Sequence, residues 1–322
     1  MFDECSDTTA RRSPIRTPAQ GRKDRHRLSG LLSGRGSAPP CDQARQPILP
    51  AILVVAEPAI TNVAAHYPLV VTQYASRGFL RGQVGNEYPM YPLAAAGFVV
   101  LSIDWTRFTN FEQSHTPAEW NAMFAQKGRE LVWSGIRRGI DELIAAGLVD
   151  PAKMALTGLS GGAENVHFVL QRDDRFAAAI ASSAAADLTF FALASEDGDR
   201  ERLMKTFNSP TVIPQPGSKI YDLAWSNKPE KLVTPLLINV GEYEALIGFE
   251  GISAIKTIGG PLEVRIFPGE QHLKYHPRAI LGVYENNLQW LQFWLMNKED
   301  PAPEFSEQYQ RWREMRARLD RK

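Results

Sequence analysis

The segment from Gly158 to Gly162 carries the clearest chemical pattern in the chain, Gly-Leu-Ser-Gly-Gly. A short apolar run that begins at Lys153 precedes it, and a helix-forming run follows it. This arrangement is typical of a nucleophile elbow, a tight strand-to-helix turn that exposes a serine hydroxyl. The flanking glycines tolerate unusual backbone angles and leave room for a substrate carbonyl. We therefore expect Ser160 to be a nucleophile, whereas a glycine-rich turn with a structural serine is the alternative.

A nucleophilic serine needs a general base near neutral pH, and histidine is the usual one. In elbow-containing hydrolases the triad follows the chain order serine, acid, histidine. Of the six histidines, only His272 and His276 follow the last expected strand. His272 lies in a loop at the carboxyl end of that strand, where sites in parallel sheets are built. We assign His272 as the base, with His276 as the alternative, and expect His167 to pack within the helix after Ser160.

The acid should leave the preceding strand, where the chain reads Gly-Glu-Tyr-Glu from position 241. In hydrolases that carry such an elbow, the acid usually occupies the last position of a Gly-x-x-Asp turn. In this chain that position is Glu244. A glutamate can orient the histidine and stabilise its charged form, since the role is positional and electrostatic. Glu242 is the competing candidate. Two solvated loop carboxylates would be the default interpretation without Ser160 and His272.

An oxyanion hole needs two hydrogen-bond donors. We expect the backbone N–H of Gly161, directly after the nucleophile, to supply one. The second should come from the loop after the strand at residues 68–74, so the hydroxyl of Tyr74 is the candidate. A strand-end aromatic packed into the core is the alternative for Tyr74.

The elements that would position these residues alternate between strands and helices. Strands are expected at residues 68–74, 97–104, from 153 to the elbow, and at 176–182, 234–240 and 262–267; helices are expected within 117–147 and at 249–258, 279–296 and 305–319. This alternation predicts an α/β fold with a mostly parallel sheet and helices on both faces, as in an α/β-hydrolase. Residues 187–232 show no sheet pattern and are expected to cross the active-site rim.

The composition of the chain argues against several classes of protein. The 322 residues are 44% hydrophobic and carry no formal net charge, so nothing global indicates a nucleic-acid or membrane-surface partner. No apolar run approaches the roughly 18 residues of a membrane span, and no secretory signal opens the chain, so we expect a cytoplasmic protein. The cysteines, Cys5 and Cys41, precede the expected core, which excludes a disulfide framework or thiolate metal site there.

Residues 1–46 form a basic segment rich in Ser, Pro and Gly, which we expect to be disordered because it offers little apolar surface to bury. A nucleic-acid or membrane arm and a wrongly assigned start codon are the alternatives. The globular pattern begins at Pro47, so residues 47–322 are expected to form one catalytic domain.

The chain resembles the catalytic domain of prolyl oligopeptidase-type serine peptidases over roughly residues 65–297. The resemblance is carried by Tyr74 at a strand end, Asp150-Pro151 before the elbow strand, Thr234-Pro-Leu-Leu-Ile before the acid turn, and Pro268-Gly-Glu-Gln-His272. In that family a tyrosine hydroxyl lends the second oxyanion contact, which implies this role for Tyr74. The family normally carries an N-terminal β-propeller that gates the site, and we expect none in this chain.

A narrower resemblance is to the lasso-peptide isopeptidases, a branch of the same family. It is carried by the run from Tyr74 to Pro89 and by glutamate at the acid position. These enzymes hydrolyse the isopeptide bond between an N-terminal amine and an Asp or Glu side chain. The resemblance makes Arg77, Arg81 and Glu87 candidate substrate contacts, although each could instead form a structural ion pair.

Together these features predict a serine-type peptidase that cleaves an amide bond of a peptide or isopeptide through Ser160, His272 and Glu244, with no metal or cofactor. A carboxylesterase on the same fold is one alternative. An inactive truncated fragment, or a binding module without its propeller, is the other. The oligomeric state stays open.

Overall fold

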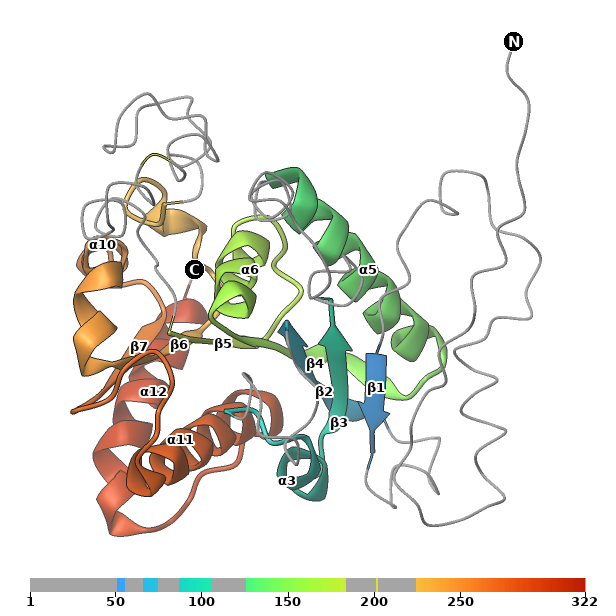
Figure 1. Cartoon of the computed structure of the whole chain (residues 1–322). Coiled ribbons are helices and arrows are strands. Elements are labelled where there is room, and N and C mark those ends of the chain that lie inside the picture. The colour runs from blue at the N-terminus through green and yellow to red at the C-terminus, as the bar shows by residue number, and fades with distance from the viewer. Residues whose placement is uncertain are drawn as a thin grey trace.

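The structure is a computed structural model that describes residues 51–55, 66–74, 87–105, 126–183, 201 and 224–321 (Figure 1). The basic segment at residues 1–46 lies outside these ranges, as does most of the expected rim segment at 187–232. The division of the chain at residue 46 therefore stays a prediction.

Within the described ranges the strands form one seven-stranded sheet in the order β1-β3-β2-β4-β5-β6-β7. The strands are β1 Ala51–Val54, β2 Tyr67–Tyr74, β3 Val99–Asp104, β4 Val149–Leu159, β5 Ala178–Ser182, β6 Leu236–Gly241 and β7 Leu262–Phe267. Only β1 pairs antiparallel, and every other neighbouring pair is parallel. The mostly parallel α/β sheet is thus confirmed. Its parallel strands bring their carboxyl ends to one edge, where the loops that carry the candidate site residues begin.

Helices cover both faces of this sheet (Figure 1). One face is covered by α5 Gln126–Ala145 and α6 Gly161–Leu170, with α10 Phe249–Thr257 beside β7; the other is covered by α3 Met90–Ala95, α11 Pro277–Met296 and α12 Ser306–Leu319. The helices expected at 249–258, 279–296 and 305–319 agree with α10, α11 and α12 to within two residues at each end.

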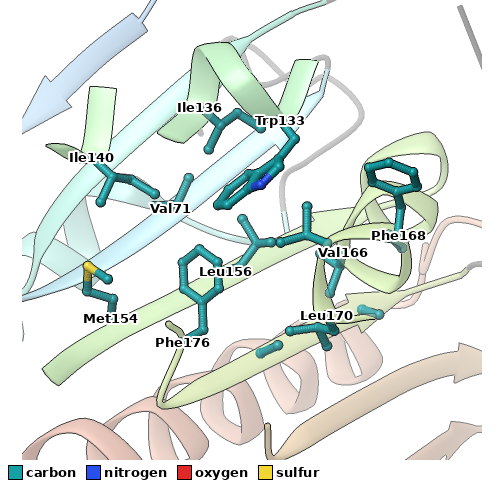
Figure 2. Packing of buried hydrophobic residues seen from close by; sticks show 14 of the residues in the cluster. Val71, Trp133, Ile136, Ile140, Met154, Leu156, Val166, Phe168, Leu170 and Phe176 are labelled. Carbon is teal, nitrogen blue, oxygen red and sulfur yellow. The ribbon is translucent and has the colours of Figure 1, made fainter. Parts of the chain in front are cut away.

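Side chains alternate along the central strands and divide the core in two. Val71 of β2 belongs to the core under α5 and α6, whereas its neighbour Val70 belongs to the core under α11 and α12. This alternation follows from the two-residue period of a strand, and both positions are apolar because the sheet is buried on both faces. Figure 2 shows Trp133, Ile136 and Ile140 of α5 directed at the sheet residues of the first core.

The C-terminal helix is held by aromatic packing. Trp312 of α12 is fully buried and meets Trp290 of α11 edge to face, with ring centroids 5.0 Å apart. Phe293 and Tyr309 complete the cluster. Edge-to-face contacts suit the ring quadrupoles and add to the apolar burial. The packing fixes α11, whose first residues follow the His272 loop.

Three elements differ from the sequence prediction. The edge strand β1 and the short helix α3 were not expected, and β4 begins at Val149 rather than at Lys153. Asp150 and Pro151 thus lie within β4, beside a register shift in its pairing with β2. In the described part of the chain, no helix combines the length and the apolar character needed to cross a membrane.

Candidate active site

Ser160 stands between β4 and α6 in a strained turn. Its φ of 56° and ψ of −124° lie in a sparsely populated region that costs about 1–3 kcal/mol, a strain that clusters at functional sites. Its N–H donates to the carbonyl of Ser182 at 3.0 Å. A Cβ at Gly158 would lie 2.4 Å from the carbonyl of Gly162, so only glycine allows the helix to turn back this closely. The structure therefore builds the elbow expected from the Gly-x-Ser-x-Gly spacing.

Tyr74 ends β2 beside the start of α6. Its φ is 85°, and a Cβ on Gly162 would lie 2.9 Å from the Cβ of Tyr74, so the tyrosine packs directly against the helix start. Burial, and then the negative charge of Glu164, raise the pKa of Tyr74, which keeps its hydroxyl protonated as a donor. Gly161 is the first residue of α6. Of the two expected oxyanion donors, Gly161 thus directly follows Ser160, and Tyr74 packs against the start of the same helix.

A buried amide that the sequence prediction missed holds this corner together. The side-chain oxygen of Gln73 accepts a hydrogen bond from Asn165 of α6 at 2.7 Å and from the indole of Trp105 at 3.3 Å. Trp105 in turn packs on the ring of Tyr74, with centroids 4.8 Å apart. The ends of β2 and β3 are therefore joined to the helix that begins after Ser160.

The turn after β6 and the loop after β7 bring His272 to Glu244. The Nδ1 of His272 lies 2.8 Å from Oε1 of Glu244. Because a carboxylate can only accept, Nδ1 carries the proton and Nε2 is the proton acceptor of the neutral ring. Glu242 takes another partner, since its carboxylate accepts from the N–H of Gly269 at 2.8 Å. Of the two candidate acids, the structure thus pairs Glu244 with His272.

Close backbone contact explains how the two loops meet. A Cβ at Gly241, the last residue of β6, would lie 2.3 Å from the carbonyl oxygen of Gln271 and 2.5 Å from that of Glu270. Any larger residue at position 241 would push the two loops apart. This glycine therefore permits the contact between His272 and the acid turn.

The alternative base, His276, is the N-cap residue of α11 and is engaged elsewhere. Its Nδ1 lies 2.6 Å from Oε1 of Glu270, whose carboxylate also accepts from the backbone N–H groups of Tyr275 at 2.7 Å and His276 at 3.1 Å. The side chain of Glu270 is only 1% exposed. Glu270 thus organises the loop from within, and it was not expected from the sequence.

These contacts predict a pH dependence of stability. Burial opposes ionisation of Glu270, but the hydrogen bonds from Tyr275 and His276 outweigh it and lower its pKa below the usual 4.5. The ionised carboxylate of Glu270 therefore contributes fully to the free energy of unfolding above its unfolded-state pKa. This contribution is lost as pH falls through the lower folded-state pKa. Glu270→Gln is expected to cost about 2 kcal/mol of unfolding free energy at neutral pH.

Urea unfolding across a pH series checks this expectation. The difference between wild type and Glu270→Gln should shrink as pH falls below 4.5. Glu285→Gln, at an exposed position of α11, is the matched control and should leave stability unchanged. A pH-independent difference would show that the carboxylate charge of Glu270 plays no part.

His167, expected to pack within the helix after Ser160, is buried on α6. Its Nδ1 accepts a hydrogen bond from the indole of Trp225 at 2.8 Å. Burial, and then the positive charge of Arg129, lower the pKa of His167 to about 4. It is therefore a neutral core residue at physiological pH.

The candidate substrate contacts divide into two groups. Arg77 and Arg81 lie outside the described residues, and their roles stay predictions. Glu87 is buried, and its carboxylate lies 2.9 Å from the ammonium of Lys274. Glu87 thus forms the internal ion pair that was the structural alternative, and its contact with substrate stays a prediction. Within the described residues, no three side chains of the metal-binding types gather at one point.

Comparison with known proteins places this fold in a family. Residues 86–298 match the model of the prolyl oligopeptidase family. The chain is 38% identical over 260 residues to the lasso peptide isopeptidase AtxE2 of Asticcacaulis excentricus, covering 80% of this chain and 37% of that protein. It thus spans well under half the length of this curated relative.

Solved structures of serine peptidases also match this chain. The apo structure of AtxE2 superposes with a TM-score of 0.75 at 36% identity, covering 84% of this chain and 42% of that one. An AtxE2 variant with Astexin3-dC4 bound gives 0.74 at 35% identity, with the same coverage. The acylaminoacyl peptidase of Pyrococcus horikoshii shares the fold, with a TM-score of 0.60 at 16% identity over 79% of this chain and 41% of that one. The chain therefore has the α/β-hydrolase fold of these serine peptidases and belongs to the prolyl oligopeptidase family.

Proposed function

We propose that this serine peptidase is a lasso-peptide isopeptidase that works through Ser160, His272 and Glu244. The observation that carries the substrate class is the 38% identity to a lasso peptide isopeptidase over 80% of this chain. The bond between His272 and Glu244 supports the catalytic assignment.

Acylation begins when Oγ of Ser160 attacks the isopeptide carbonyl carbon. Nε2 of His272 takes the hydroxyl proton, and Glu244 stabilises the resulting imidazolium. The N–H of Gly161 and the hydroxyl of Tyr74 receive the oxyanion that forms on the carbonyl oxygen. His272 then gives its proton to the amine nitrogen, the C–N bond breaks, and the N-terminal amine leaves.

Deacylation repeats these steps with water. His272 removes a proton from the water, whose oxygen attacks the ester carbonyl, and the tetrahedral intermediate collapses with return of the proton to Ser160. The products are the released amine and the Asp or Glu side-chain acid of the opened ring. The sum is the addition of one water molecule to one amide bond.

Incubation of the purified chain with a lasso peptide, followed by mass spectrometry, tests the proposal. We expect a mass gain of one water with Ser160 intact and no gain with Ser160→Ala. Fragmentation should place the new acid at the ring-closing side chain. Turnover of p-nitrophenyl acetate without ring opening would contradict the isopeptidase assignment and favour a carboxylesterase.

A further inference from the structure

A buried ion pair lies next to the loop that carries His272. The ammonium of Lys274, two residues after His272, is 2.9 Å from the carboxylate of Glu87, and the two side chains are only 1% and 10% exposed. Buried ion pairs are a weak source of net stability, because desolvation of both charges offsets their attraction. This pair therefore points to a role in placing the chain segments that it joins.

Lys274 also binds the end of β5. Its ammonium donates to the hydroxyl of Ser183 at 2.7 Å. Ser183 has a φ of 49°, and its N–H donates to the carbonyl of Asn239 in β6 at 2.9 Å. The His272 loop is thus attached to the carboxyl ends of the two strands between β4 and β7.

The residue after Glu87 binds the nucleophile turn. The hydroxyl of Tyr88 donates to the carbonyl of Gly158 at 2.9 Å, and it lies 3.1 Å from Oγ of Ser182. The carbonyl of Ser182 accepts the N–H of Ser160. Burial, and then the charge of Glu87, raise the pKa of Tyr88 well above its usual value, which keeps this donor protonated.

We infer that the Glu87–Tyr88 segment aligns the two halves of the catalytic machinery. Glu87 holds the histidine loop through Lys274, and Tyr88 holds the serine turn through Gly158. A side-chain amide of α11 also holds this segment, since Asn287 donates to the backbone carbonyl of Glu87 at 3.1 Å. Glu87 and Lys274 are therefore positioning residues for the proton transfer between Ser160 and His272. The inference rests on the proposed function.

The rate of phosphonylation by a small alkyl fluorophosphonate tests it. In this reaction the serine oxygen bonds to phosphorus, fluoride leaves, and His272 takes the serine proton, so the rate reports alignment with little contribution from substrate binding. Glu87→Gln and Lys274→Met each leave one charge without its partner. We therefore expect the melting temperature of each single variant to fall by about 10 °C. The double variant removes both charges and should melt near wild type. Its phosphonylation should still be about 10- to 100-fold slower.

Peptide hydrolysis provides a second readout, since loss of alignment should lower kcat of the double variant and leave KM unchanged. Ser183→Ala keeps both charges and removes only the bond from Lys274, so the variant should fold and, through the loss of alignment, react about tenfold more slowly. The matched control is Arg138→Met with Glu142→Gln, a part-buried pair at 3.1 Å within α5, which should react at the wild-type rate.

Two results would overturn the inference. A folded double variant, or a folded Ser183→Ala variant, that reacts at the wild-type rate would reduce the pair to a purely structural contact. A well-folded wild type that is not phosphonylated would overturn the proposed function and the inference with it. These two failures are distinguishable because only the second affects the wild-type chain.

Discussion

Ser160→Ala is expected to lower turnover of a p-nitrophenyl ester by at least about 10,000-fold while leaving the fold intact. Alanine keeps the volume near that of serine but removes the oxygen that forms the acyl-enzyme bond. The strained turn should persist in the variant, because the N–H at position 160 still donates to the carbonyl of Ser182. Steady-state rates with matched circular dichroism spectra check this expectation.

Ser134→Ala is the control for this variant. Ser134 is a half-buried serine of α5, and the one hydrogen bond of its hydroxyl among the described residues goes to the carbonyl of Leu131 in the same helix, at 2.7 Å. It should retain the wild-type rate. Turnover by Ser160→Ala close to that of wild type would remove Ser160 from the mechanism.

The kcat values of Glu244→Gln and Glu242→Gln should differ by orders of magnitude, although the two residues stand two positions apart in the sequence. Glu244→Gln removes the charge that stabilises the imidazolium of His272 and allows an amide N–H to face Nδ1, which favours the wrong tautomer. A loss of about 10,000-fold in kcat has this physical basis in related triads. Glu242 accepts from the N–H of Gly269, and a glutamine oxygen can do the same, so we expect less than about tenfold loss there.

Measurement of kcat and KM for both variants on one peptide amide substrate separates the two roles. The loss in Glu244→Gln should fall on kcat, since the acid acts in the transition state. A large loss in Glu242→Gln with an active Glu244→Gln would show that the triad acid is misassigned.

Local pattern was enough to predict the elbow. Gly158, Ser160 and Gly162 lie within one turn, and the steric reason for Gly158 is its close contact with the nearby Gly162, whereas Gly162 faces Tyr74 from a distant strand. The order of the strands from β2 to β7 was predictable for the same reason, because two-residue and 3.6-residue periods are properties of each segment alone, whereas β1 and α3 were not expected. The parallel sheet then followed from their alternation.

Contacts between distant segments limited the rest. The choice between Glu244 and Glu242 depends on where the loop after β7 lies, since Gly269 holds one acid and His272 the other. The burial of Glu87 depends in the same way on Lys274, far along the chain. The antiparallel direction of β1 is likewise set by its neighbour β3 and not by its own four residues.

Peptide mapping of the wild-type chain after reaction with a fluorophosphonate tests the central claim most directly. The account predicts a single stoichiometric adduct on the peptide that contains Ser160, which is lost in Ser160→Ala and strongly slowed in Glu244→Gln. An adduct on another residue, or a well-folded wild type that forms no adduct, would contradict the assignment of Ser160 as the nucleophile.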